Sequence, residues 1–127
     1  MEHKILIIDG HPVYIHKLDG FLRSLTFKNV SLASSAGEGI EKVRTQQPDL
    51  VILSGMLPDA ESVEVCKLIK EIHPMVRMIV QVGLFTEKEA VERFIKHGAH
   101  SVLPRKEKDL HPLQSSIESL LCLKSSV

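Results

Sequence analysis

The chain has 127 residues, and its 16 basic and 16 acidic side chains cancel to no net charge. This length suits one domain of ordinary size, which can close a hydrophobic core without metals or disulfides. The charge balance gives no electrostatic reason to expect nucleic acid, a membrane surface or a polyanionic substrate as a partner.

The two cysteines, Cys66 and Cys122, lie far apart in apolar helical patterns, with no C-x-x-C motif. We expect both to be buried free thiols in a reducing compartment, which favours a cytoplasmic location. The N-terminal apolar run covers only 5–8, which is too short for a signal-peptide core or a membrane span. The sequence therefore predicts a cytoplasmic protein with no membrane association.

Five short apolar runs rich in branched residues predict strands that are buried on both faces. In chain order they are 5–8, 30–33, 50–53, 78–82 and 101–103. Segments with apolar residues three or four positions apart predict helices between and after these strands. In chain order they are 15–25, 36–47, 65–72, 90–95 and 110–121. The second helix has the weakest pattern, and Pro48 ends it.

Strict alternation of strands and helices predicts a parallel five-stranded sheet with helices on both faces, the doubly wound three-layer α/β fold. Ligands of such sheets bind outside the carboxyl ends of the strands. We therefore expect the functional site in the loops 9–12, 54–59 and 83–85. The whole chain, 1–127, is interpreted as one domain with its core at about 3–123 and a Ser-rich end that frays.

Three stretches of the sequence resemble a known family: ILIIDGHPVYIHKLDGFL, QQPDLVILSGMLPDAESVEVCKLIK and IKHGAHSVLP. They are similar to the receiver domains of bacterial response regulators, the CheY-like superfamily, and above all to the NarL/LuxR-type subfamily whose first strand ends in Asp-Asp-His-Pro. The most specific pieces are PDLVIL followed by Met-Leu-Pro, and the Gly98-Ala99 pair. The resemblance covers almost the whole chain. It implies the flavodoxin-like strand order 2-1-3-4-5 and a role in two-component or phosphorelay signalling.

In that family two adjacent acids end the first strand, and an aspartate that ends the third strand accepts the phosphoryl group. Clustered carboxylates bind Mg²⁺, which neutralises the transferring phosphoryl group together with a lysine. Here Asp9 matches the first acid, but Gly10 takes the place of the second and Ser54 that of the phosphoacceptor. We therefore expect no Mg²⁺, no cofactor and no catalytic residue, with Asp9 accepting hydrogen bonds from the following turn or from Arg105.

The other positions of the family's pocket have also changed. Met56 lies in the loop after the third strand, and Gly83 falls where a Ser or Thr is expected. Arg105 falls at the lysine position, although Lys106 is an alternative for that role. Val102 replaces an aromatic residue that pairs with the Ser or Thr in the family's activation switch. The resemblance thus implies that both halves of this switch are missing.

Three further patterns are explained more simply by local structure than by serine phosphorylation, hydrolysis or metal binding. Ser54 is expected to hydrogen-bond loop backbone, since a serine phosphoester would need a different kinase and a phosphatase. Asp9, His11 and Ser54 share one rim of the sheet, but without a G-x-S-x-G elbow they do not predict a hydrolase. His97 and His100 have metal-like spacing without an acid or cysteine nearby, so we expect solvated surface and no metal.

These departures favour a pseudo-receiver, not an enzyme, which signals by binding a protein partner or a second copy of itself. Candidate interface residues lie on the fourth helix, the fifth strand and the fifth helix: Val91, Phe94, Arg105, Lys106 and Leu113. The alternative is a switch that responds to a small ligand, an anion or unconventional phosphorylation, with space left by Gly10 and Gly83 and with Arg105 as anchor. Either form is compatible with a longer DNA-binding transcriptional regulator, although these residues contain no helix-turn-helix. A flavin-binding domain is disfavoured because DGHPVY lacks a phosphate cradle.

Overall fold

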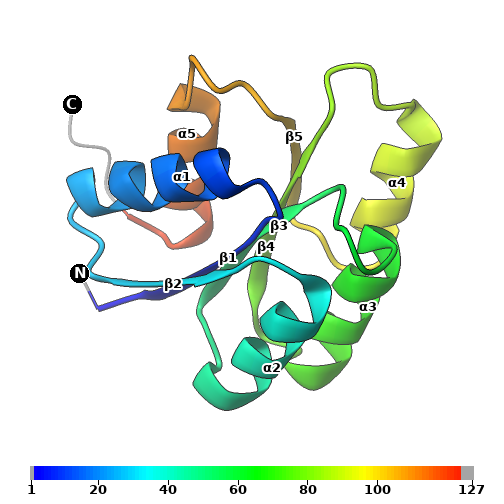
Figure 1. The fold of residues 1–127 in the computed structure, drawn as a ribbon, viewed down its shortest axis with the longest axis horizontal. Coiled ribbons are helices and arrows are strands. Elements are labelled where there is room, and N and C mark those ends of the chain that lie inside the picture. Colours follow the sequence, from blue (N-terminus) through cyan, green and yellow to red (C-terminus); the bar gives the residue numbers. More distant parts are fainter. Residues whose placement is uncertain (1, 124–127) are drawn as a thin grey trace.

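The computed structural model describes residues 2–123 (Figure 1). Its five strands are β1 (Lys4–Ile8), β2 (Asn29–Ala33), β3 (Leu50–Ser54), β4 (Arg77–Val82) and β5 (Ser101–Pro104). Its five helices are α1 (Pro12–Ser24), α2 (Ala36–Gln46), α3 (Ser62–Ile72), α4 (Lys88–Lys96) and α5 (His111–Leu120). Each predicted strand and helix is confirmed, with small shifts at the ends. The predicted fraying after Leu123 falls outside the described residues.

The strands form one parallel sheet in the order β2-β1-β3-β4-β5, which confirms the doubly wound fold and the flavodoxin-like strand order. The register places Ile8 beside Leu53, and Ser54 beside Gln81. As a result, the loops that follow β1, β3 and β4 open at the same edge of the sheet. This is the edge at which ligands of such folds bind.

Helices cover both faces of the sheet (Figure 1), and a cluster of hydrophobic side chains lies between the helices and the sheet on each face. The side chains of Ile5 and Ile7 point to the layer under α1 and α5, whereas those of Leu6 and Ile8 point to the layer under α2, α3 and α4. Successive side chains of a strand point to opposite faces, so both faces of a central strand need apolar residues. This requirement explains why the strands appear in the sequence as unbroken apolar runs.

The first helix begins directly beside the functional edge of the sheet. Pro12 opens α1, where a missing backbone N–H costs no helical hydrogen bond. The Nδ1 atom of His11 accepts a hydrogen bond from the backbone N–H of Tyr14 at 3.1 Å and so caps the helix. The short β1–α1 loop is thereby fixed, and it holds Asp9 and Tyr14 in place.

A second contact fixes the loop between β3 and α3. The carboxylate of Asp59 accepts hydrogen bonds from the backbone N–H groups of Ala36 at 2.8 Å and Gly37 at 3.1 Å, at the start of α2. These two hydrogen bonds, the one from Ala36 above all, lower the pKa of Asp59. The loop that carries Met56 and Pro58 is therefore tied to a neighbouring helix.

The two cysteines differ in their surroundings. Cys66 is a buried free thiol, as predicted, and burial raises its pKa to about 11. The prediction for Cys122 was wrong, because its thiol is free but exposed. Cys122 comes just after the end of α5 and has a backbone φ of 56°, which takes it out of the helical pattern. Within the described part of the chain, no helix is both long and apolar enough to cross a membrane.

Candidate functional site

The site is built around Asp9, which directly follows β1 and is only 2% exposed. One carboxylate oxygen accepts a hydrogen bond from the backbone N–H of His11 at 2.9 Å. The other accepts a hydrogen bond from the guanidinium of Arg105, with which it forms an ion pair. Both acceptor groups of the buried carboxylate therefore have partners, one from the following turn and one from the end of β5.

Arg105 reaches Asp9 from a fixed position on the sheet. Its backbone N–H donates to the carbonyl of Val82 at 2.8 Å, which extends the pairing of β5 with β4 by one residue. Its guanidinium also lies 4.0 Å from the centre of the Tyr14 ring, within the range of a cation–π interaction. Lys106 is exposed. Of the two candidates for the lysine role, it is thus Arg105 that contacts the pocket.

Two residues of the site, Tyr14 and Gln81, were missed by the sequence analysis. The side-chain amide of Gln81 donates a hydrogen bond to the hydroxyl of Tyr14 at 2.9 Å, in the interior of the protein. Burial raises the pKa of the Tyr14 phenol. Gln81 is a polar residue within an otherwise apolar predicted strand, and this was the signal that could have identified it. The connected groups are Asp9, Arg105, Tyr14 and Gln81, which we call the Asp9–Arg105 network.

Ser54 ends β3 at the family's phosphoacceptor position and is 6% exposed. Its hydroxyl donates to the carbonyl of Met56 at 2.8 Å and accepts from the N–H of Met56 at 3.2 Å. Both hydrogen-bonding roles of the hydroxyl are therefore used by its own loop, as expected from the sequence. The side chain of Met56 is 85% exposed and contributes apolar surface at the rim.

The two glycines of the pocket leave different amounts of space. A Cβ atom on Gly10 would lie 3.0 Å from Cδ of Pro58, so a side chain at the second acid position requires the proline ring to move. A Cβ atom on Gly83 would meet only the hydroxyl oxygen of Thr86, at 3.6 Å. The open side of the pocket is therefore next to Gly83.

Val102 is partly buried and packs on the core.

The residues present do not fit the Mg²⁺ ion that the family implies. Between residues 2 and 123, no cluster of three or more His, Cys, Asp or Glu side chains could hold a metal ion. Asp9 supplies the single carboxylate of the family's acidic set, and that carboxylate is paired with Arg105. Mg²⁺ is usually held through one or two carboxylates with water completing an octahedral shell, so the ion would have to displace Arg105 from Asp9.

The other candidate groups are occupied by local structure. Asp9 contacts His11 through the backbone N–H, and the His11 ring caps α1, so the two are not arranged as a catalytic acid–base pair with Ser54. The Nδ1 atom of His100 accepts a hydrogen bond from the backbone N–H of Met78 at 3.2 Å. His97 ends α4.

Two of the predicted interface residues are in the core. Phe94, on α4, is 3% exposed, and Leu113, on α5, is 2% exposed. Each belongs to the hydrophobic cluster between its helix and the sheet. These predictions were wrong because both residues lie on the inward face of an amphipathic helix, where an apolar side chain is buried against the sheet. Val91 is partly buried and Lys106 is exposed.

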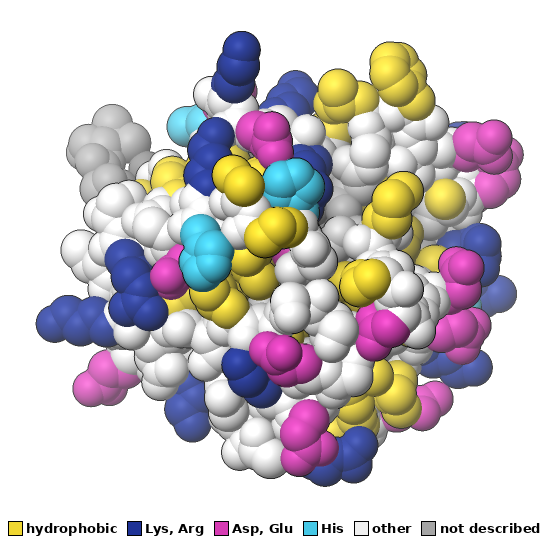
Figure 2. Space-filling view, viewed as in Figure 1, with side chains coloured by type: hydrophobic (Ala, Val, Ile, Leu, Met, Phe, Trp, Pro, Cys, Tyr) yellow, Lys and Arg dark blue, Asp and Glu magenta, His cyan; other side chains and the backbone are white. Residues whose placement is uncertain are grey.

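The exposed apolar side chains of this region lie elsewhere. Figure 2 shows hydrophobic side chains at the upper right, over the loop that joins β4 to α4. Leu84 and Phe85 in this loop are 64% and 97% exposed, and Ile95 on α4 is 54% exposed. We call Leu84 and Phe85 the β4–α4 tip. Contiguous apolar surface can mark an interaction site, and the β4–α4 tip has two adjacent exposed apolar side chains.

Comparison with known proteins agrees with the geometry. A family described as response regulator receiver domain matches residues 5–118. The transcriptional regulatory protein ZraR of Escherichia coli (strain K12) is 29% identical over 123 residues, which are 97% of this chain and 27% of that protein. The alkaline phosphatase synthesis transcriptional regulatory protein PhoP of Bacillus subtilis (strain 168) is 34% identical over 71 residues, which are 56% of this chain and 29% of that protein. The chain thus spans less than a third of the length of these regulators.

Solved structures show the same relationship. The crystal structure of a two-component response regulator from Clostridium difficile superposes with a TM-score of 0.87 and 26% identity, covering 95% of this chain and 97% of that one. A CheY-like receiver domain protein from Methanospirillum hungatei JF-1 gives a TM-score of 0.81 and 25% identity, covering 93% of each chain. The chain belongs to the response regulator receiver domain family of two-component signalling.

Proposed function

We propose that this receiver domain is a pseudo-receiver, which signals by binding a protein partner without aspartyl phosphorylation. The observation that carries the proposal is the ion pair between Arg105 and Asp9 in the place where the family binds Mg²⁺. A buried carboxylate must be paired with a positive charge, and here the protein supplies that charge itself. The domain is thereby held in one state by its own side chain.

The domain lacks the two groups that phosphoryl transfer needs, a carboxylate acceptor and the acidic cluster that binds a cation. The acceptor must be a carboxylate to give an acyl phosphate, and position 54 has a hydroxyl that is hydrogen-bonded to its own loop. A cation would have to displace Arg105 in order to reach Asp9, and it would then find one carboxylate where the family offers three. For the same reasons we assign the domain no enzymatic activity.

A protein partner is the occupant that the surface supports. The chain has no net charge, so the attraction must come from local contacts. The β4–α4 tip places an aromatic and an aliphatic side chain in solvent, close in sequence to the pocket residue Gly83. Aromatic residues are the most frequent energetic anchors of protein interfaces. The free thiols of Cys66 and Cys122 support a reducing compartment such as the cytoplasm.

The proposal predicts that the pocket does not respond to the ligands of an active receiver. An amide NMR titration with Mg²⁺, followed by beryllofluoride, should give no saturable shifts at residues 9–12, 54–58, 83–85 and 102–106. The matched control is the double variant Gly10→Asp/Ser54→Asp, which restores the two missing carboxylates. It should gain Mg²⁺-dependent shifts at these loops, because it recovers the donor set that the cation needs.

Two results would overturn this proposal. Saturable shifts at the four loops of the natural chain with Mg²⁺ and beryllofluoride would show a functional phosphorylation pocket. A covalent phosphate on Ser54 after incubation with acetyl phosphate, detected by intact mass, would show unconventional phosphorylation.

A further inference from the structure

A cavity of about 340 Å³ lies between the loops that follow β3 and β4, on the open side of the pocket next to Gly83. Its volume is at the lower end of the range for small-molecule sites. Asp9 is not part of its lining, whereas Arg105 borders it. Gln81 also lines the cavity, so two members of the Asp9–Arg105 network border it. Ser54, Met56 and Gly83 of the degenerate pocket form a second wall, and the ends of α3 and α4 form the rest.

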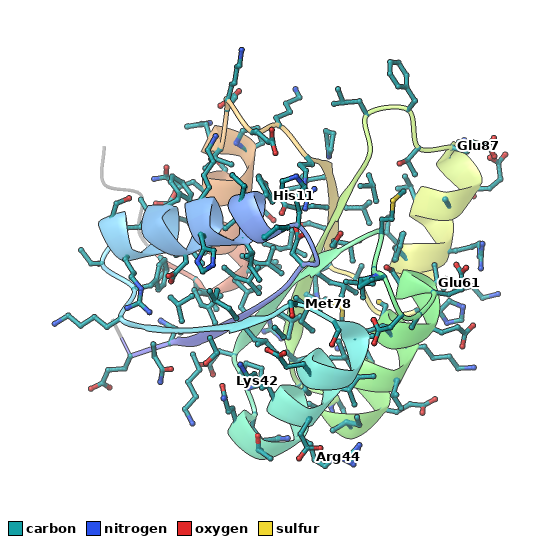
Figure 3. All side chains as sticks on the ribbon, in the orientation of Figure 1. His11, Lys42, Arg44, Glu61, Met78 and Glu87 are labelled. Carbon is teal, nitrogen blue, oxygen red and sulfur yellow. The ribbon has the colours of Figure 1, made fainter. Side chains whose placement is uncertain are left out.

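One wall of the cavity is the N-terminal end of α3. Glu61, Ser62 and Val63 line it, and the side chain of Glu61 at the N-cap makes no capping hydrogen bond. Figure 3 labels Glu61 at the start of α3 and Glu87 at the start of α4, two helices on the same side of the sheet. The first N–H groups of an α-helix have no partners within the helix, and they favour a negative charge.

Ser62 adds an independent observation. It is 4% exposed, and its hydroxyl oxygen has no hydrogen-bond partner among the described residues. Buried hydroxyl groups nearly always have a partner, because an unpaired one loses its hydrogen bonds to water without replacement. Ser62 lines the cavity, but its hydroxyl oxygen has almost no accessible surface, so a ligand oxygen would reach it only after the side chain changes rotamer.

Arg93 supplies a positive charge at the same cavity. It lies on α4 and makes no ion pair with the described residues, whereas Arg105 is neutralised by Asp9. Glu61 is the carboxylate on the rim and is exposed to solvent. The donors at the cavity are thus the exposed guanidinium of Arg93, the N–H groups at the N-terminal end of α3 and the Ser62 hydroxyl, and the Glu61 carboxylate opposes them.

The remaining walls are apolar. Val82, Ala90 and Phe94 line the cavity between the sheet and α4. These side chains make no hydrogen bonds with a hydrated anion such as phosphate, but they can bury a hydrocarbon chain. A ligand that suits both parts has one charged head and a short apolar body.

We propose that this cavity binds a small aliphatic monocarboxylate, with its carboxylate between the start of α3 and Arg93 and its chain against Val82 and Phe94. The inference rests on the cavity and not on the absence of phosphorylation, because an active receiver with these walls could bind the same ligand. Binding at this site would couple α3, α4 and the loop that carries the β4–α4 tip.

The test is an amide NMR titration of the full chain with acetate, butyrate and hexanoate at constant ionic strength. Butyrate and hexanoate should shift residues 54–56, 61–64, 82–86 and 90–94 in a saturable manner. Affinity should rise by roughly fourfold for each added methylene until the cavity is filled. The alcohol 1-butanol and inorganic phosphate should bind at least about tenfold more weakly than butyrate. The alcohol lacks the carboxylate, and phosphate lacks the apolar chain.

Matched variants separate the proposed contacts from general effects. Ser62→Ala should weaken butyrate by about fivefold without harming the fold, since the hydroxyl has no partner in the protein. Arg93→Ala should weaken it by about threefold to fivefold, as expected for an exposed charge, whereas Lys96→Ala, which removes a positive charge from the same helix outside the cavity, should leave it unchanged. Ala90→Leu should abolish binding by filling the space.

Three outcomes would overturn the inference. Equal shifts with butyrate, phosphate and chloride would indicate an adventitious ion only. Equal binding of 1-butanol would show that the carboxylate is not recognised. Unchanged butyrate binding in both Ser62→Ala and Arg93→Ala would place the ligand elsewhere. None of these results depends on the response to Mg²⁺ and beryllofluoride, so the two proposals fail separately.

Discussion

At the scale of single residues, the guanidinium of Arg105 makes two contacts, an ion pair and a cation–π interaction. Its guanidinium pairs with the buried carboxylate of Asp9 and lies on the ring of Tyr14, while the Tyr14 hydroxyl holds the amide of Gln81. Both oxygens of the Asp9 carboxylate, the Tyr14 hydroxyl and the Gln81 side-chain N–H have partners in this chain of contacts. Networks of this kind stabilise one arrangement strongly, and they become costly when one member is removed.

Replacing Arg105 with Met should destabilise the domain by roughly 3 kcal/mol, because it leaves the carboxylate of Asp9 buried without its ion-pair partner. Urea denaturation followed by circular dichroism measures this loss. The double variant Asp9→Asn/Arg105→Met should lose less than Arg105→Met alone, since the unpaired charge is gone.

Lys106→Met is the control for this experiment. It removes an exposed cation from the next position and should change stability by less than about 0.5 kcal/mol. A loss of several kcal/mol in Lys106→Met, or none in Arg105→Met, would mean that the ion pair with Asp9 does not stabilise the fold.

At the scale of the elements, periodicity was sufficient to predict every strand and helix, because buried strands and amphipathic helices repeat their apolar residues at fixed intervals. The site was predictable only in part. Asp9, Ser54 and Arg105 lie at the ends of three different strands, and the resemblance to a family supplied their common location. Gln81 was hidden within a strand, and its partner Tyr14 within a helix, since sequence spacing does not reveal contacts between distant elements.

The contact between β4 and the start of β5 should make stability depend on pH. The backbone N–H of His100 donates to the Met78 carbonyl at 2.8 Å, and its Nδ1 accepts from the Met78 N–H at 3.2 Å. Burial, with help from Lys70 and Arg77, lowers the pKa of His100 from its ordinary value of 6.5. The folded state thus takes up this proton less readily than the unfolded state. The contribution of His100 is fully present above pH 6.5 and is lost as pH falls through the depressed pKa.

Replacing His100 with Asn should therefore reduce the loss of unfolding free energy that accompanies a fall in pH from above 6.5 to below it. Urea denaturation of the natural chain and the variant at several pH values measures the difference between the two slopes. His97→Asn, in the same turn, serves as the control for removal of an imidazole. Identical slopes in the natural chain and in His100→Asn would exclude a role for this group.

At the scale of the whole molecule, the same region contains two phenylalanines with opposite surroundings. Phe94 is 3% exposed under α4, and Phe85 is 97% exposed at the β4–α4 tip. The buried ring of Phe94 is part of the hydrophobic cluster on one face of the sheet. The ring of Phe85 makes no comparable contribution to folding, so it is free to contact another molecule.

Phe94→Ala should cost about 3 to 5 kcal/mol of unfolding free energy, whereas Phe85→Ala should change it by less than about 0.5 kcal/mol. Parallel urea denaturation measures both values. A protein partner bound through the β4–α4 tip should bind Leu84→Ala/Phe85→Ala at least about tenfold more weakly than the natural chain, because apolar anchors dominate interface energies. Equal affinity in the two proteins would move the interface away from this loop, and a large loss of stability in Phe85→Ala would make the ring a structural element.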